Sequence, residues 1–128
     1  MSNLTTKGIQ VTVDPEYLDE SSYPDKGKFV FTYHVEIYNK GFHQVQLINR
    51  HWIIMDANNE RREVKGPGVI GVQPIINPGE SHAYDSFSVL ETPIGKMYGK
   101  YEMKNLKTNE LFEVRIPAFK LVATYVNN

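Results

Sequence analysis

Apolar and polar residues alternate along most of the chain with a period of two. In the stretch 28–40 the apolar face is formed by Phe29, Phe31, Tyr33, Val35 and Ile37. Thr32, His34 and Glu36 take the opposite face. This alternation is typical of a β-strand that buries one side and exposes the other to water.

The same period recurs to the end of the chain and predicts seven or eight strands. The segments with this character are 8–14, 28–40, 44–57, 60–65, 68–76, 81–90, 96–105 and 110–124. Turn signals fall between them, and no segment keeps a helical period for three turns. The two ends, 1–6 and 125–128, lack the pattern and are expected to be frayed.

The strand 44–57 changes phase part of the way along. Val45 and Leu47 share one face, whereas Ile48, Trp52 and Ile54 share the other. Either a β-bulge near Asn49–Arg50 or burial on both faces would reconcile the two sets. Trp52 also suits the core tryptophan position of an immunoglobulin-like or fibronectin-like sandwich.

These features predict one all-β domain over residues 1–128. The number and spacing of the strands favour an antiparallel two-sheet sandwich of the immunoglobulin or fibronectin type III kind, with an open barrel as the alternative. A chain of 128 residues is long enough to bury a substantial core.

Charge and composition narrow the function classes. Lys and Arg number 14 against 15 Asp and Glu, a formal net charge of −1, so no global attraction to nucleic acid or anionic membranes is expected. The absence of cysteine excludes disulfides, zinc–thiolate sites and thiol catalysis. With no signal-like or membrane-length apolar run, a cytoplasmic location is predicted.

The segment KGPGVIGVQP contains Gly66, Gly68 and Gly71, which spell G-x-G-x-x-G. A dinucleotide fingerprint requires a helix after the glycines, because the helix N-terminus holds the pyrophosphate. Here β-branched residues and Pro74 follow, and no helix begins at reasonable cost. The ordinary interpretation is a tight loop between strands.

An anion site at the same loop remains an alternative. Glycine-rich turns on β proteins can expose successive N–H groups to an anion, and Arg61, Arg62 and Lys65 lie nearby in the sequence. The candidate residues are Arg61, Arg62, Lys65, Gly66, Gly68 and Gly71. Adjacent residues of a strand point to opposite faces, so at most one arginine joins Lys65.

No metal, cofactor or catalytic site is predicted. Among four histidines, His34 and Glu36 share a face, which is half of a metal site, but exposed polar residues on a wet face are the better interpretation. Ser81, Ser86 and Ser88 lie near His82 on one strand, where nucleophile, base and orienting acid do not meet. The chain is therefore expected not to be an enzyme.

Aromatic residues are frequent, with eight Tyr, six Phe and one Trp. Tyr98 and Tyr101 near Lys100 raise the option of base stacking with phosphate contacts. A sandwich core with an added protein-binding surface accounts for the aromatic residues better, because the net charge is close to zero.

Residues 50–104 resemble the ApaG family, a domain of unknown biochemical function. The motifs are GPGVIGVQPIINPGESHAY and LETPIGKMYGKYEM, with support from VTVDPEYL, FTYHVEIYN and FEVRIPAFKL. The resemblance covers about residues 6–122, which we take as the core of the domain. Two positions depart from the expected pattern: Val72 replaces a charged residue, and Phe87 replaces a small one.

The resemblance implies a fibronectin type III-like sandwich, a link by name to cobalt and magnesium efflux, and a role in protein recognition. It supplies no catalytic residues. We therefore expect a non-enzymatic module that binds an unidentified protein partner and not nucleic acid or membrane, and a homo-oligomer is left open. The alternative is binding of pyrophosphate or a nucleotide phosphate at the Gly66–Gly71 loop.

Overall fold

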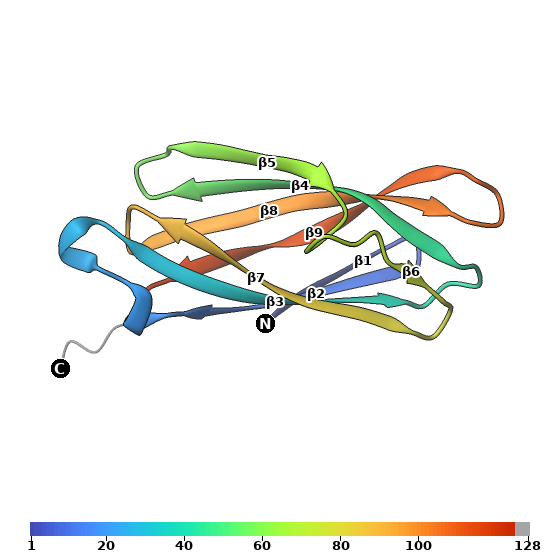
Figure 1. The fold of residues 1–128 in the computed structure, drawn as a ribbon, viewed down its shortest axis with the longest axis horizontal. Helices are drawn as coiled ribbons and strands as arrows, with labels where there is room; N and C mark the ends of the chain where they lie inside the picture. The colour runs from blue at the N-terminus through green and yellow to red at the C-terminus, as the bar shows by residue number, and fades with distance from the viewer. Residues whose placement is uncertain (125–128) are drawn as a thin grey trace.

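Two antiparallel β-sheets pack face to face in the computed structural model of the chain, which describes residues 1–124 (Figure 1). The predicted all-β sandwich is confirmed. Short 3₁₀ turns at Asp19–Ser21 and Pro24–Lys26 are the only helical elements in the described residues. Nothing in residues 1–124 forms a helix with the length and apolar character that a bilayer crossing requires.

The first sheet has the strand order β1-β2-β3-β7, and the second has β5-β4-β8-β9 with β6 added against β4. The strands are β1 (Ser2–Thr6), β2 (Ile9–Tyr17), β3 (Phe29–Asn39), β4 (Val45–Asp56), β5 (Arg61–Pro67), β6 (Ile75–Ile76), β7 (Ser81–Leu90), β8 (Ile94–Asn105) and β9 (Leu111–Val122).

The prediction of frayed ends was wrong for the N-terminus. Ser2–Thr6 forms β1 and pairs with Ile9–Val13 of β2, because a tight turn at Lys7–Gly8 with positive φ at both residues folds the segment back. The other predicted frayed end, 125–128, lies outside the described residues. In 68–76 only Ile75–Ile76 is a strand, so most of that segment is a loop.

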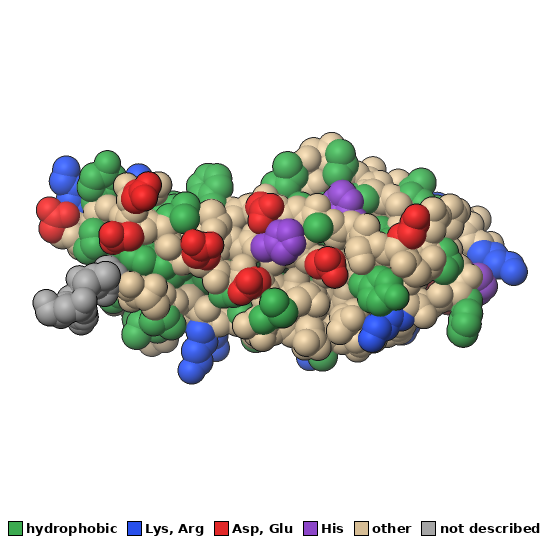
Figure 2. Space-filling view, turned by 90° about the horizontal axis from the view of Figure 1, so that it is seen from below, with side chains coloured by type: hydrophobic (Ala, Val, Ile, Leu, Met, Phe, Trp, Pro, Cys, Tyr) green, Lys and Arg blue, Asp and Glu red, His purple; other side chains and the backbone are tan. Residues whose placement is uncertain are grey.

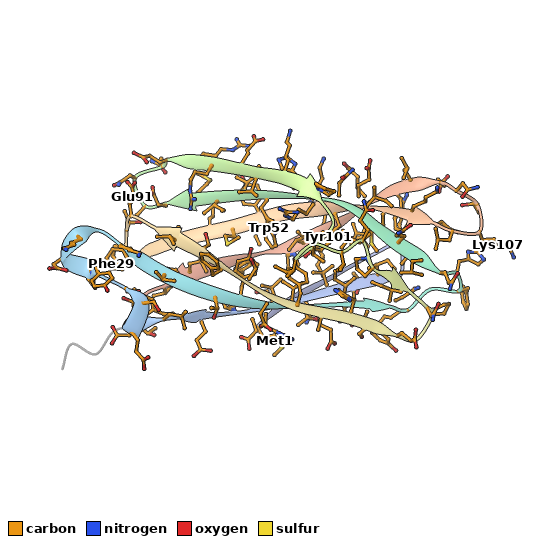
Figure 3. The ribbon with its side chains drawn as sticks, viewed as in Figure 1. Met1, Phe29, Trp52, Glu91, Tyr101 and Lys107 are labelled. Atoms are coloured by element: carbon orange, nitrogen blue, oxygen red, sulfur yellow. The ribbon has the colours of Figure 1, made fainter. Side chains whose placement is uncertain are left out.

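The aromatic core lies between the sheets and is centred on Trp52, as predicted. Trp52 and Tyr101 point into the space between the two sheets (Figure 3). Tyr33 meets the indole in an edge contact with ring centroids 5.3 Å apart, and Phe119 does the same at 6.0 Å. Such aromatic pairs contribute about 0.5–1.5 kcal/mol each beyond the burial of their area.

A β-bulge in β4 explains the change of phase. The pairing of β4 with β8 shifts register between Leu47 and Asn49, so Ile48 is an extra residue. The extra residue brings Arg50, Trp52 and Ile54 to the same inward face as Leu47. Of the two predicted alternatives the bulge is confirmed, at Ile48, just before the expected Asn49–Arg50. Its consequence is that an arginine faces the interior.

The two long sides of the sandwich differ. On one side β9 lies alongside β1 and β2, and the backbone N–H of Arg115 donates to Thr6 Oγ1 at 3.2 Å. On the other side the sheets end at β5 and β7, which do not pair with each other. In Figure 1 β5 lies well beyond β7, with no strand of the first sheet in front of it. We call this second side the opening.

Candidate functional site

The glycine loop borders the opening, and two of its glycines are required by backbone conformation. Gly68 has φ +60°, and a Cβ there would clash with the carbonyl of Val72. Ile70 (φ 46°) and Gly71 (φ 77°) form the centre of a two-residue turn with the positive φ pair of type I′. Left-handed conformation is uncommon for a β-branched residue, and the turn leaves Ile70 62% exposed.

Gly66 has a different role, which concerns Arg50. A Cβ on Gly66 would lie 3.0–3.2 Å from the guanidinium of Arg50, closer than carbon atoms normally approach. The absence of a side chain therefore lets the guanidinium lie against the β5 backbone. Its Nη1 donates to the carbonyl oxygens of Pro67 at 2.9 Å and Gly68 at 3.0 Å, which fixes both the arginine and the loop.

Three N–H groups of the loop already have partners inside the protein. Gly68 donates to the carbonyl of Ile48 at 2.8 Å, and Val69 and Val72 donate to each other's carbonyl oxygens at 2.8 and 3.1 Å. These amides stabilise the loop itself. They do not form a converging set of open donors of the kind that holds a phosphate.

The cations predicted to assist the loop do not converge on it. Arg61 and Lys65 lie on the outer face of β5, on either side of Glu63, at 3.5 and 3.8 Å from its carboxylate oxygens. Arg62 points to the inner face, where its Nη2 donates to the carbonyl of Val89 on β7 at 2.6 Å. The sequence-based set is thus divided between two faces.

The outer face near β5 carries a shallow groove of about 550 Å³. Two ion pairs lie in or beside it: Lys100 with Glu113 at 2.6 Å, and His51 with Glu63 at 3.3 Å. The hydrogen bond from His51 lowers the pKa of Glu63, and the one from Lys100 lowers the pKa of Glu113. The groove is lined by cations and carboxylates together, with Arg50, Lys65 and Lys100 beside Glu102 and Glu113.

Arg50 lies beside a cluster of tyrosines at the opening. Burial raises the pKa of Tyr33 and of Tyr84, despite the nearby positive charge of Arg50. The hydroxyls of Tyr84 and Tyr101 are hydrogen bonded to each other, and burial raises the pKa of Tyr101 well above its usual range. The three phenols therefore remain neutral at physiological pH and act as hydrogen-bonding groups.

Apolar side chains form the rim of the opening. Phe87 is 67% exposed on the outer face of the edge strand β7, and Val64 is exposed on the inner face of β5. Ile70 and Val72 add to the rim from the loop. Val72 and Phe87, the two positions at which the sequence resemblance led us to expect a different residue, both increase the apolar surface that faces water.

The four histidines lie in separate places among the described residues. His34 and Asp85 pair on the outer face of the first sheet, at 2.9 Å. His82 is on the inner face of the same sheet, next to Tyr84, while His43 lies within 3.2 Å of the Asn105 amide and His51 belongs to the outer groove. The half-site at His34 and Glu36 gains no third ligand in residues 1–124.

A group of three carboxylates was not anticipated from the sequence. Asp56, Glu60 and Glu91 bring oxygen atoms within 4.8 Å of one another at one end of the sandwich, where Figure 3 labels Glu91. Asp56 Oδ1 already accepts hydrogen bonds from the N–H groups of Asn58 and Glu60. These bonds account for Asp56 as a turn-forming residue.

The exposed face seen in Figure 2 carries acidic side chains and histidine over its surface, with basic side chains mainly toward its rim. It is the view from below in Figure 1, the side on which the first sheet lies. Such a face lacks the clustered positive charge that would attract a phosphate backbone.

Arg50 is a functional candidate that was not among the site residues predicted from the sequence. The signal for it was the phase slip in 44–57, because a bulge places residue 50 on the same face as the core tryptophan. Arg50 is hydrogen bonded to the end of β5 and the glycine loop and lines a cleft with β7 of the other sheet, and no local pattern indicates this convergence.

Comparison with known proteins identifies relatives across most of the chain. The ApaG domain family model matches residues 19–105. A protein named ApaG from Rhodospirillum centenum is 50% identical over 121 residues, covering 94% of this chain and 92% of the relative. The ApaG protein of Paramagnetospirillum magneticum is 49% identical with the same coverage.

Solved structures agree with this similarity. The structure described as a putative ApaA protein from Bordetella pertussis superposes with a TM-score of 0.88 at 42% identity, covering 92% of this chain and 95% of that one. A second structure, described only as a structural genomics target, superposes with a TM-score of 0.85 at 41% identity, covering 91% and 88%.

Proposed function

Since the chain belongs to the ApaG domain family, we propose that it is a non-enzymatic binding module whose ligand is another protein. The observation that supports this most is the apolar rim on two unpaired sheet edges. Val64 is exposed on the inner face of β5 at the opening, and Phe87 is exposed on the outer face of the edge strand β7. Exposed apolar groups beside unpaired edges are typical of surfaces that bind protein segments.

The partner is unidentified, and the same proposal includes a cytoplasmic place of action. Any part in cobalt and magnesium efflux is played through that partner. Association of two copies of the chain also stays a prediction.

Anion binding at the Gly66–Gly71 loop remains a prediction, and the geometry favours it less. The loop N–H groups are already hydrogen bonded within the protein at Gly68, Val69 and Val72. The nearby cations Arg61 and Lys65 lie on the outer face beside Glu63. Pyrophosphate or a nucleotide phosphate would therefore have to displace existing interactions at the loop.

Site-specific photocrosslinking in the cells that naturally produce the protein tests the recognition proposal. A photoreactive phenylalanine analogue replaces Phe87 at the opening or, as a matched control, Phe42, which is 92% exposed in the β3–β4 loop. We expect a discrete protein adduct from position 87 and not from position 42. The captured protein should then bind the purified Phe42→Ala variant normally and the Phe87→Ala variant weakly.

Two results would contradict the proposal. One is the same set of adducts from both positions, which would indicate random collisions with abundant proteins. The other is the absence of any adduct from position 87 under conditions in which position 42 crosslinks.

A further inference from the structure

A cleft of about 250 Å³ lies inside the opening, under the inner face of β5. Its walls come from both sheet edges: Arg62 and Val64 of β5, and Ser86, Ser88 and Phe87 of β7, with Arg50 of β4 at its inner end. The cleft exists because β5 extends beyond the last strand of the first sheet.

The cleft is positively charged. It contains the two guanidinium groups of Arg50 and Arg62, and no Asp or Glu lines it. Neither guanidinium lies within 4.0 Å of a carboxylate oxygen in residues 1–124. Their hydrogen bonds go to three carbonyl oxygens, of Pro67, Gly68 and Val89. Because each guanidinium has five N–H donors, both retain donors for a ligand.

A buried hydroxyl without a partner lies in the same cleft. Ser88 is 6% exposed, and its Oγ has no hydrogen-bond partner among the described residues. Ser86, on the same face of β7, is hydrogen bonded to the Tyr33 side chain. Buried polar groups are almost always satisfied, so the orphaned hydroxyl is a second indication that a polar group from outside belongs here.

The edge next to the cleft has room for one more strand. The first sheet ends at β7, whereas the facing sheet continues to β5. An extended segment beside β7 would lie under Val64 and cover it. Arg62 already takes the carbonyl of Val89 near the end of β7, so such a segment would run along the part of β7 before that residue.

We propose that the opening receives an extended segment of the partner protein along β7, anchored by a carboxylate side chain that binds Arg50, Arg62 and Ser88. Charge complementarity selects the acidic residue, since two guanidinium groups, neither within 4.0 Å of a carboxylate oxygen in residues 1–124, line one small space. The proposal rests on the protein-recognition function and names the chemistry that the partner must supply.

Selection from a displayed library of random linear peptides as long as β7, ten residues, tests the proposal with the intact protein as bait. We expect binders with Asp or Glu at one fixed position. Their affinity should fall at least roughly tenfold in the Arg62→Met variant, because a charge-assisted hydrogen bond is lost. The matched control is Arg61→Met, which removes the same charge from the outer face of the same strand.

NMR of the arginine side chains provides the second measurement. An acidic binder should shift the Nε–Hε signals of Arg50 and Arg62 and leave that of Arg61 unchanged. Arg62 is the first choice for substitution because it is exposed, so its loss should not impair folding. The Arg50→Lys variant is compared only after its melting temperature has been measured.

The outcomes separate this inference from the function on which it rests. Peptides that bind at β5 and β7 without an acidic residue, or that lose equal affinity with Arg61→Met and Arg62→Met, would overturn the carboxylate anchor and keep protein recognition at the opening. Peptides that bind only elsewhere would overturn both.

Discussion

The two long sides of the sandwich end their sheets in opposite ways. Where β9 meets β1 and β2, the side is closed by the hydrogen bond between Arg115 N–H and Thr6 Oγ1. The ammonium group of Lys7 also lies 5.9 Å from the Phe112 ring centroid across the same seam. At the opening, the side chain of Arg62 reaches from β5 to the β7 backbone.

The difference shows which side of the sandwich is held by contacts between the sheets and which side leaves its strand edges available to other molecules. A sandwich needs only one closed side to hold its core, because the side chains between the sheets already bury most of the apolar area. The opening keeps unpaired edges, which are open to other chains unless they are protected. Here charged groups on β5, including Arg61, Glu63 and Lys65, discourage unspecific pairing along it.

The largest expected effect comes from removing an apolar side chain on each side. Leu121→Ala, in β9 on the closed side, should lower the free energy of unfolding by about 2–5 kcal/mol, because Leu121 is fully buried. Phe87→Ala, at the opening, should change it by about 0.5 kcal/mol or less. Urea unfolding of both variants measures the contrast. Equal losses would mean that the opening is packed as tightly as the closed side.

A smaller contrast lies within the opening itself. Gly68→Ala should cost roughly 2–4 kcal/mol, because the new Cβ clashes with the Val72 backbone in addition to the strain of positive φ. Gly71→Ala, with open space around it, should cost only about 1–2 kcal/mol of φ strain. Thermal unfolding of the two variants distinguishes them. If Gly71→Ala were the more damaging, the turn and not the Gly68 contact would hold the loop.

The smallest effect is a pH dependence that belongs to the tyrosines at the opening. Tyr33, Tyr84 and Tyr101 have pKa values raised by burial above the ordinary value of 10.0. The unfolded chain therefore loses these protons first, so stability is complete below about pH 10 and falls as the pH rises toward the folded pKa values. At pH 10 the three together should cost about 1 kcal/mol, since each is half ionised when unfolded.

Urea unfolding at a series of alkaline pH values, followed by tyrosinate absorbance, measures this loss. In the Tyr84→Phe variant the decline should be shallower, because one titrating group is gone. An unchanged slope would show that Tyr84 ionises at the same pH in the folded and unfolded chain.

Much of the fold was predictable because strand period, turns and core residues are local properties of the sequence. The alternation in 28–40 and the slip in 44–57 correctly indicated a strand and a bulge. The segment Ser2–Thr6 was missed because its residues are mostly polar and exposed, and its strand depends on pairing with β2 and closure against β9. Such pairing leaves little trace in the pattern of a single segment.

The site was less predictable, for a physical reason. The glycine pattern correctly indicated a tight loop, but its first glycine makes room for a guanidinium from another strand. Neighbours in sequence, Arg61 and Arg62, separate to opposite faces, whereas Arg50 and Ser88 meet at one cleft across the two sheets. Contacts between distant segments are decided by the packing of the sheets, which no motif records.

The extra residue of the bulge, Ile48, holds the glycine loop in place through its backbone carbonyl. The carbonyl of Ile48 accepts hydrogen bonds from Gly68 N–H and from Gln73 Nε2, at 2.8 and 3.0 Å. Deleting Ile48 would restore a regular strand with Arg50 and Trp52 still facing inward. The chain would keep its sandwich but lose the two hydrogen bonds that hold the glycine loop at the opening. One residue therefore fixes the position of the loop without being needed for the pairing of the strands.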